Sequence, residues 1–153
     1  IYFKSVSYGL VPYFSPRRHI SIIYVRDLVD AIIRAAEHPA TAGNTYFVAN
    51  EQPFAINELA GLIKTALRNN KISCHLWLPD ILIKGLAALS EGLSRLSGRP
   101  AIFNRQKALK LTCNYWVCRV VRAKQDFQWT ARTTLPDGVK ETVRWYREYK
   151  WLK

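Results

Sequence analysis

The chain has 153 residues and 49% of them are apolar, so it can bury a hydrophobic core and is not a wholly disordered protein. Its 23 Lys and Arg residues exceed its 11 Asp and Glu residues, which gives a formal net charge of +12. Such an excess favours an anionic partner, namely a phosphate-bearing substrate, a nucleic acid or a membrane surface.

The first part of the chain predicts a strand, a helix and a second strand, in that order. The run Ile20–Val25 is β-branched and aromatic, and because nearly every position is apolar we expect a strand buried on both faces. Apolar residues then recur at helical spacing from Asp27 to the breakers Pro39 and Gly43. We expect Asp27 to cap this helix or to complement its dipole. A second short strand at Thr45–Ala49 completes a predicted βαβ unit.

The rest of the chain is predicted to be mainly helical. The expected helices cover residues 56–69, 79–97, 104–111, 120–127 and 136–149, and short strands are expected at 72–78 and 115–118. Thr134 and Asp137 resemble a capping box for the last helix. Ala55, by contrast, leaves the helix that follows it without a capping side chain.

The helix expected after Pro79 carries a leucine stripe. Its leucines alternate at spacings of four and three residues: Leu82, Leu86, Leu89, Leu93 and Leu96. This pattern is typical of a helix face that packs on a core, and it is also the spacing of a short coiled-coil seam. We interpret the stripe as core-facing and keep the seam as the alternative.

The three cysteines, Cys74, Cys113 and Cys118, form no Cys-x-x-Cys pair. Their number is odd and no histidine pair lies nearby, so neither a zinc site nor a disulfide framework is indicated. We interpret them as small buried hydrophobic residues of a protein in a reducing compartment.

Motifs for catalysis are few. The chain has no Gly-x-Ser-x-Gly elbow, no His-x-x-x-His pair, no phosphate loop and no Gly-rich dinucleotide turn. Tyr146 and Lys150 match Tyr-x-x-x-Lys, a spacing at which lysine can assist proton transfer by tyrosine. We interpret them as a surface pair on the terminal helix, and we expect no catalytic residue and no metal site in this chain.

Basic and aromatic residues are interleaved toward the C-terminus, as they are on many nucleic-acid-binding surfaces. They include Tyr115, Trp116, Arg119, Arg122, Trp129, Arg144, Trp145, Arg147, Lys150 and Trp151. Most of these aromatic residues fall on apolar faces of short elements. We therefore expect the aromatic side chains in the core and the basic ones on a solvated face.

Five segments carry motifs in a recognisable order: Ile22–Ala31, Gly43–Val48, Ile56–Leu59, Arg122–Trp129 and Leu135–Tyr146. They include the run Val-Arg-Asp-Leu, the run Gly-Asn-Thr-Tyr-Phe-Val, and the closing run Leu-Pro-Asp-Gly-Val-Lys-Glu-Thr-Val-Arg-Trp-Tyr. Together these segments resemble the second half of the extended short-chain dehydrogenases/reductases, the NAD-dependent epimerase/dehydratase family.

The resemblance implies an α/β fold made of the terminal βαβ strands of a Rossmann-type sheet and a mainly helical substrate-binding lobe. As an isolated fragment the chain would count as α+β. Residues 20–50 would complete the sheet, residues 51–153 would form the lobe, and the N-terminal cofactor domain would be absent. The lack of any Met agrees with a fragment. NAD or NADP is implied for the intact parent, bound mainly by the missing part, so the chain alone is expected to bind no cofactor and to be inactive.

The sequence also departs from the family at several positions. The family usually carries Asp where this chain has Arg119, and often Gly where Gln128 stands. Sugar-nucleotide epimerases often place an arginine for the diphosphate at the position of Thr112. This departure argues against a nucleotide-sugar substrate, and the pattern is more similar to the hydroxysteroid-dehydrogenase-like and reductase-like branch. The family resemblance as a whole implies a sugar nucleotide or a similar small molecule as substrate.

Two hypotheses of function follow. In the first, the chain is the substrate-binding portion of an NAD(P)-dependent epimerase, dehydratase or reductase acting on a hydroxyl or carbonyl carbon. Tyr13, Arg17 and Arg18 would then line the substrate side, because loop arginines at the end of a sheet suit a phosphate or carboxylate. In the second, the chain is a free-standing basic module for nucleic acid or another polyanion, which we consider the weaker reading.

Three further expectations concern location and partners. We expect a cytoplasmic protein with a small-molecule substrate. The apolar run from Leu76 to Leu96 is interrupted by charged residues, so no membrane span is expected. The isolated chain is expected to self-associate or form a homo-oligomer through exposed strand edges.

Overall fold

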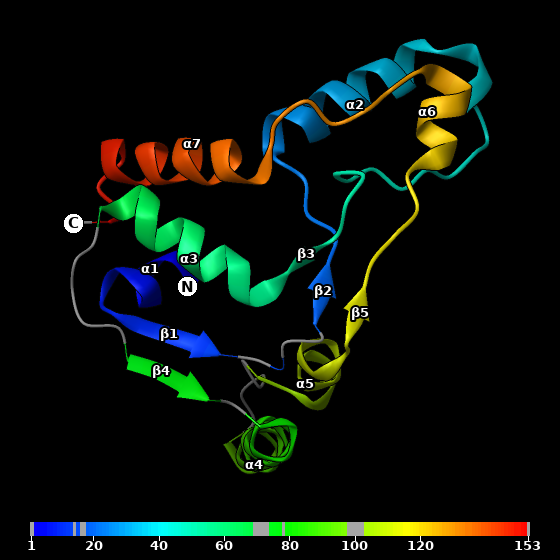
Figure 1. The fold of residues 1–153 in the computed structure, drawn as a ribbon. Helices are drawn as coiled ribbons and strands as arrows, with labels where there is room; N and C mark the ends of the chain where they lie inside the picture. Colours follow the sequence, from blue (N-terminus) through cyan, green and yellow to red (C-terminus); the bar gives the residue numbers. More distant parts are fainter. Residues whose placement is uncertain are drawn as a thin grey trace.

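The computed structural model describes residues 2–13, 15, 18–68, 74–77, 79–97 and 103–152 (Figure 1). Its helices are α1 (Tyr2–Ser7), α2 (Val25–Glu37), α3 (Ile56–Leu67), α4 (Asp80–Ser97), α5 (Arg105–Thr112), α6 (Val121–Phe127) and α7 (Leu135–Glu148), with a 3-10 turn η1 (Pro39–Thr41). Its strands are β1 (Leu10–Tyr13), β2 (His19–Ile20), β3 (Phe54–Ala55), β4 (Cys74–Trp77) and β5 (Tyr115–Trp116).

The strands form two small sheets. β1 and β4 pair in parallel, with Leu10 opposite Cys74. In the second sheet β2 lies in the centre, antiparallel to β3 and parallel to β5. α2 and α6 lie at one end of the molecule and α4 and α5 at the other, with β2 and β5 between them (Figure 1). The predicted α/β class is confirmed.

The predicted strands are longer than the observed ones. Instead of a strand over Ile20–Val25, the chain forms β2 over His19–Ile20 and enters α2 at Val25. No strand is assigned to residues 45–49, so the second strand of the predicted βαβ unit is wrong. Asn50 donates its N–H to the Ile22 carbonyl at 3.0 Å, but no ladder develops around this bond. A strand needs a ladder of backbone partners, and apolar sequence alone does not supply one.

The core consists of three clusters of buried side chains. The first lies where α3, α7 and α1 meet and includes Ile63, Val139 and Val143, all at most 4% exposed. The second lies between α4 and α5, and the third packs α2 against α6. α3 and α7 lie side by side (Figure 1). Most of the apolar burial is therefore between helices.

The predicted capping features are confirmed. The Thr134 hydroxyl accepts the N–H of Asp137 at 3.3 Å and donates to the Asp137 carboxylate at 2.6 Å, which stabilises the start of α7. Ala55 occupies the N-cap of α3 with no side-chain hydrogen bond. Arg68 ends α3 in the left-handed region, with φ of 49°.

The leucine stripe of α4 is not core-facing, contrary to the prediction. Leu82, Leu86, Leu89 and Leu93 are 45%, 49%, 61% and 58% exposed, and the Leu96 side chain lies outside the described part. The buried residues of the helix are Ile83 and Ala87, which pack against Ala108 of α5. Small alanines on both helices allow the two backbones to approach, so this face is buried in preference to the leucine face.

The expectation that the C-terminal aromatic residues are buried is mostly wrong. Trp129 is 2% exposed, and its indole N–H donates to Asp30 at 3.0 Å. Tyr146 is half-buried and packs against the first cluster. The others are substantially exposed: Tyr115, Trp116, Trp145 and Trp151. Trp145 stacks on Tyr149 with ring centroids 4.6 Å apart. Large rings can therefore cover one another at the end of a helix without entering the core.

The cysteines differ from the prediction as well. All three are free thiols, but Cys74 and Cys113 are exposed and Cys118 is half-buried. Cys74 lies on β4, a strand of a two-stranded sheet whose four residues are all exposed.

Among the described residues, no helix combines the length and the hydropathy that crossing a membrane requires.

Candidate functional site

Arg18 is the most deeply buried charged side chain that the structure describes, at 2% exposure. Its backbone is held on two sides, because its N–H donates to Ser15 at 3.1 Å and its carbonyl accepts from Ile56 at 3.0 Å. Its guanidinium forms an ion pair with Asp80 in the first turn of α4. A buried guanidinium needs such a counter-ion, so this ion pair connects the residue before β2 to α4.

A pocket of about 250 Å³ opens beside Arg18. It is lined by Arg18, Ile20, Ser21, Ile56, Lys110, Leu111, Cys113 and Trp116. Lys110 Nζ lies 5.7 Å from the centroid of the Trp116 ring, within cation–π range. Two cationic side chains beside an exposed indole can bind an anionic group and stack on a planar one. We call this cavity the Arg18 pocket.

The structure brings together only part of the predicted substrate set. Arg18 lines the Arg18 pocket, whereas Arg17 lies outside the described residues. The backbone of Tyr13 ends β1 opposite Trp77, and its side chain is outside the described part. Lys110 and Trp116 were missed as site residues. Trp116 belongs to the interleaved basic and aromatic pattern, whose aromatic residues were expected in the core, and Lys110 was not singled out.

Asp27 lies in the first turn of α2, where its charge can complement the helix dipole. The N-cap position itself belongs to Tyr24, which makes no side-chain cap bond. The Asp27 carboxylate, 9% exposed, instead accepts the backbone N–H of Thr133 at 2.9 Å. Asp27 therefore connects α2 to the segment that leads into α7, rather than capping its own helix.

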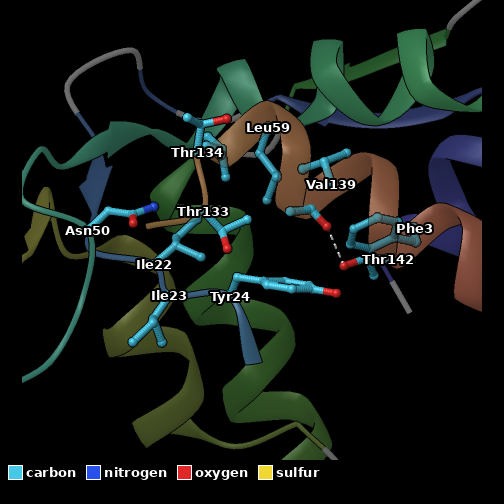
Figure 2. A pocket seen from close by; sticks show the side chains of 12 residues that line it. Phe3, Ile22, Ile23, Tyr24, Asn50, Leu59, Thr133, Thr134, Val139 and Thr142 are labelled. Carbon is cyan, nitrogen blue, oxygen red and sulfur yellow. Dashed lines mark hydrogen bonds between the residues drawn. The ribbon is translucent and has the colours of Figure 1, made fainter. Parts of the chain in front are cut away.

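A second cavity of about 150 Å³ lies between residues 22–24, α3 and the start of α7 (Figure 2). None of its lining residues is charged, and its polar groups come mainly from Asn50, Thr133, Thr134 and Thr142. The Thr142 hydroxyl is already engaged, donating to the Gly138 carbonyl at 2.7 Å (Figure 2). The cavity suits a small apolar group and offers no charge for a phosphate or carboxylate.

Gly138 explains why α7 comes so close to this cavity. A methyl group built on Gly138 would lie 3.4 Å from the Tyr24 ring, tighter than most such contacts. The motif Leu-Pro-Asp-Gly at the helix start was noted in the sequence, but not the role of its glycine in close packing.

The Tyr-x-x-x-Lys match is not assembled as a proton-transfer pair. The Tyr146 ring is stacked on Trp151 at 5.7 Å and lies edge-on to Phe3 at 5.4 Å. Lys150 follows the end of α7 with φ of 58°, so the two residues do not share a helix face. The expected absence of a catalytic role remains a prediction.

The surroundings of Tyr46 raise the pKa of its hydroxyl. Its hydroxyl donates to Asp126 at 2.7 Å, and this bond, with some burial and the charge of Asp126, raises the pKa of Tyr46 despite the nearby Arg122. The Arg122 guanidinium lies 5.2 Å from the centroid of the Tyr46 ring. The neutral hydroxyl is thus favoured, which suits a structural bond between the segment 44–46 and α6 better than proton transfer.

Comparison with known proteins gives little at the level of sequence. No family model matches the chain. The chain is 24% identical over 151 residues to the uncharacterized protein y4nL of Sinorhizobium fredii, covering 95% of this chain and 41% of that protein. Within the described ranges, no three His, Cys, Asp or Glu side chains lie close enough together to hold a metal ion.

Comparison of folds is far more informative. The epimerase of Methanothermobacter thermautotrophicus matches 99% of this chain with 37% of its own, at a TM-score of 0.70 and 14% identity. UDP-glucose 4-epimerase of Thermotoga maritima matches 97% with 38% of its own, at 0.65 and 17% identity. dTDP-glucose 4,6-dehydratase of Bacillus anthracis, solved with NAD, matches 99% with 40% of its own, at 0.60 and 18% identity.

These matches establish the fold. The chain has the architecture of the C-terminal part of Rossmann-type epimerase folds. It spans about two fifths of the length of the proteins that it matches.

Proposed function

We propose that the chain is the C-terminal, substrate-binding portion of an NAD(P)-dependent epimerase, dehydratase or related reductase that acts on a hydroxyl or carbonyl carbon. One observation carries the proposal: nearly the whole chain matches the corresponding part of several such enzymes. In enzymes of this kind, the cofactor supplies hydride transfer when bound. The sequence carries no Gly-rich dinucleotide turn, and on this proposal NAD or NADP binds mainly outside this chain.

In this proposal the Arg18 pocket receives the anionic part of the substrate. Arg18 is held in place by Asp80, so its guanidinium is oriented before any ligand arrives. Lys110 supplies a second positive charge at the pocket wall, and Trp116 supplies a face for a planar or apolar part of the ligand. The chain would thereby set substrate affinity and specificity, while the chemical step depends on residues outside it.

The first experiment reads the genomic DNA upstream of the codon for Ile1 and expresses the continuous reading frame. We expect it to encode a Gly-rich turn after a strand and a Tyr-x-x-x-Lys pair, and the longer protein to bind NADH or NADPH. The 153-residue chain is the control and is expected to bind neither. Tight NADH binding by the short chain, or an upstream frame without these motifs, would contradict the proposal.

The pocket is tested in the longer enzyme by Lys110→Ala and Trp116→Ala, with Arg95→Ala as control because Arg95 is an exposed cation on α4. Each pocket variant is expected to raise KM about tenfold with kcat nearly unchanged, the equivalent of about 1.4 kcal/mol of binding energy. Equal effects of the pocket and control variants would show that only the overall charge matters.

The polyanion-binding module remains a second candidate, because Tyr115 and Trp116 are exposed close to Lys110. It predicts retention of the 153-residue chain on heparin or single-stranded DNA, with affinity that falls steeply as salt rises. Passage through either column at low ionic strength would exclude it.

Self-association through strand edges is also proposed. β4 is exposed at all four residues and pairs with β1 on one side. An open edge of this kind can pair with another chain.

A cytoplasmic, reducing location is also proposed, because it would keep the exposed thiols of Cys74 and Cys113 free. Oxidation of the purified chain would show how readily these thiols cross-link.

A further inference from the structure

The Arg18 pocket holds less positive charge than its two cationic side chains suggest. Arg18 forms an ion pair with Asp80, so these two residues are neutral as a unit. The ion pairs of the described residues do not include Lys110. No carboxylate is found among the described residues that line the pocket. The charge that these residues leave for a ligand is therefore the single positive charge of Lys110.

Much of the pocket wall is apolar. Ile20, Ile56, Leu111 and Trp116 line it, and Trp116 is 57% exposed, so a ligand can reach its ring. The volume of about 250 Å³ lies below the range of about 300–1,000 Å³ that is usual for sites of drug-sized molecules. One small ring system with a single charged substituent fits such a space. A nucleoside diphosphate with its sugar is too large to be enclosed there.

Ser21 adds a neutral hydrogen-bond donor to this wall. Its hydroxyl oxygen accepts the backbone N–H of Cys118 at 3.1 Å. A hydroxyl that accepts a hydrogen bond still has its own proton to donate, and Ser21 lines the pocket. The pocket thus offers an anion one positive charge from Lys110 and one hydroxyl donor from Ser21, beside an indole face.

We propose that the Arg18 pocket takes a carboxylate attached to a planar or alicyclic ring, in preference to a phosphate. A carboxylate has one negative charge, which the charge of Lys110 balances. A phosphate monoester has roughly two at neutral pH, so part of its charge would lie unbalanced against an apolar wall, which is costly. The ring packs on Trp116. The inference rests on the proposed function in one respect, because the ligand of this class would be the substrate of the longer enzyme.

Cys113 provides the readout, because it lines the pocket and its thiol is exposed. The protein of the continuous reading frame is prepared with its other cysteines changed to Ser, and alkylation of Cys113 by iodoacetamide, a neutral reagent, is timed. Three probes share one ring system: 2-naphthoate, 2-naphthyl phosphate and 2-naphthol. We expect 2-naphthoate to slow alkylation at a concentration about tenfold lower than either of the others requires. Equal protection by all three probes, stronger protection by the phosphate ester, or no protection by 2-naphthoate would each overturn the proposal.

Variants of the same protein separate charge matching from shape. Lys110→Ala is expected to weaken protection by 2-naphthoate about tenfold. Lys107→Ala is the matched control on α5 and is expected to leave protection unchanged, because Lys107 does not line the pocket. Leu111→Lys, at a wall position that is 38% exposed, adds a positive charge and is expected to make the phosphate ester protect at least as well as the carboxylate.

Equal effects of the two alanine variants, or an unchanged order of the probes in Leu111→Lys, would contradict charge matching. Protection of Cys113 requires neither NADH nor turnover. A failure of this inference is therefore distinct from a failure of the proposed function, which the upstream sequence and NADH binding decide.

Discussion

Asp27 shows that a single carboxylate can stabilise the fold at a distance from its own helix. It lies in the first turn of α2, yet its hydrogen bond is to the N–H of Thr133, just before α7 begins. Hydrogen bonds to a charged acceptor are stronger than neutral ones, and a largely buried one is shielded from water. We infer that Asp27 holds the segment before α7 in place.

Replacement of Asp27 by Asn tests this role. Asp27→Asn keeps the shape but removes the charge that strengthens the bond to Thr133, so we expect unfolding to become easier by about 1–2 kcal/mol in urea denaturation. Glu37→Gln at the exposed end of the same helix is the control and is expected to change stability by less than about 0.5 kcal/mol. Equal effects would show that Asp27 acts only through its general charge.

The second residue-scale prediction concerns Asp137. Its hydrogen bond with Thr134 and the nearby Lys140 amine lower the pKa of Asp137 below the ordinary value of 3.8. The pKa of Asp137 is lower in the folded state than in the unfolded state. The ionised Asp137 carboxylate therefore stabilises the fold above about pH 4, and this stabilisation is lost as pH falls through the folded-state pKa. Thr134→Val should raise the pKa of Asp137 in a carbon-13 NMR titration, with Thr130→Val as control. An unchanged pKa in Thr134→Val would contradict the assignment.

At the scale of elements, α4 shows that one helix can carry two apolar stripes of which the fold buries one. Periodicity detected the helix and its leucines, but it does not rank two stripes against each other. The choice depended on α5, whose Ala108 admits close approach only on the face of Ile83 and Ala87. The bulkier leucine face was thereby left exposed.

Neighbouring residues of α4 provide a direct comparison. Ile83→Ala removes a side chain that is 4% exposed and should cost about 2–5 kcal/mol, whereas Leu82→Ala, at 45% exposure, should cost less than about 1 kcal/mol. Both are measured by urea denaturation at low micromolar concentration. A larger loss of stability for Leu82→Ala than for Ile83→Ala would indicate that the leucine stripe, and not the Ile83 face, packs in the core.

At the scale of the whole molecule, polar contacts connect parts of the chain that do not share a hydrophobic cluster. The ion pair of Arg18 and Asp80 joins the residue before β2 to α4. The bond of Asp27 to Thr133 joins α2 to the segment before α7. Since the apolar core is divided among three clusters, such contacts help to fix these segments relative to one another.

The two members of the Arg18–Asp80 pair should not be equivalent. Arg18 is 2% exposed whereas the Asp80 side chain is 48% exposed. Asp80→Asn removes the carboxylate that balances a buried guanidinium and should cost about 3 kcal/mol. Arg18→Met leaves a carboxylate that water can solvate and should cost clearly less in urea denaturation. A larger cost for Arg18→Met would indicate that packing of the arginine stem outweighs its charge.

The sequence by itself determined the positions of the main helices, the capping of α7 by Thr134 and the missing cap of α3 at Ala55. These features depend on residues within one or two helical turns of each other, so local spacing is enough to specify them. The ordered motifs also indicated the fold that the comparisons show. Arg18 was predicted to line the substrate side because it directly precedes an apolar run, and this role stays a prediction.

Only the tertiary structure decided the strands, the buried face of α4 and the members of the Arg18 pocket. The run from Ile20 to Val25 has the residue types of a strand. A strand forms only where another segment completes its backbone hydrogen bonds, and here the pairing with β3 and β5 extends little beyond His19 and Ile20. Lys110 and Trp116 join Arg18 because β5 pairs with β2, a contact between residues about a hundred positions apart. No local pattern encodes such a contact, because its free energy depends on both segments at once.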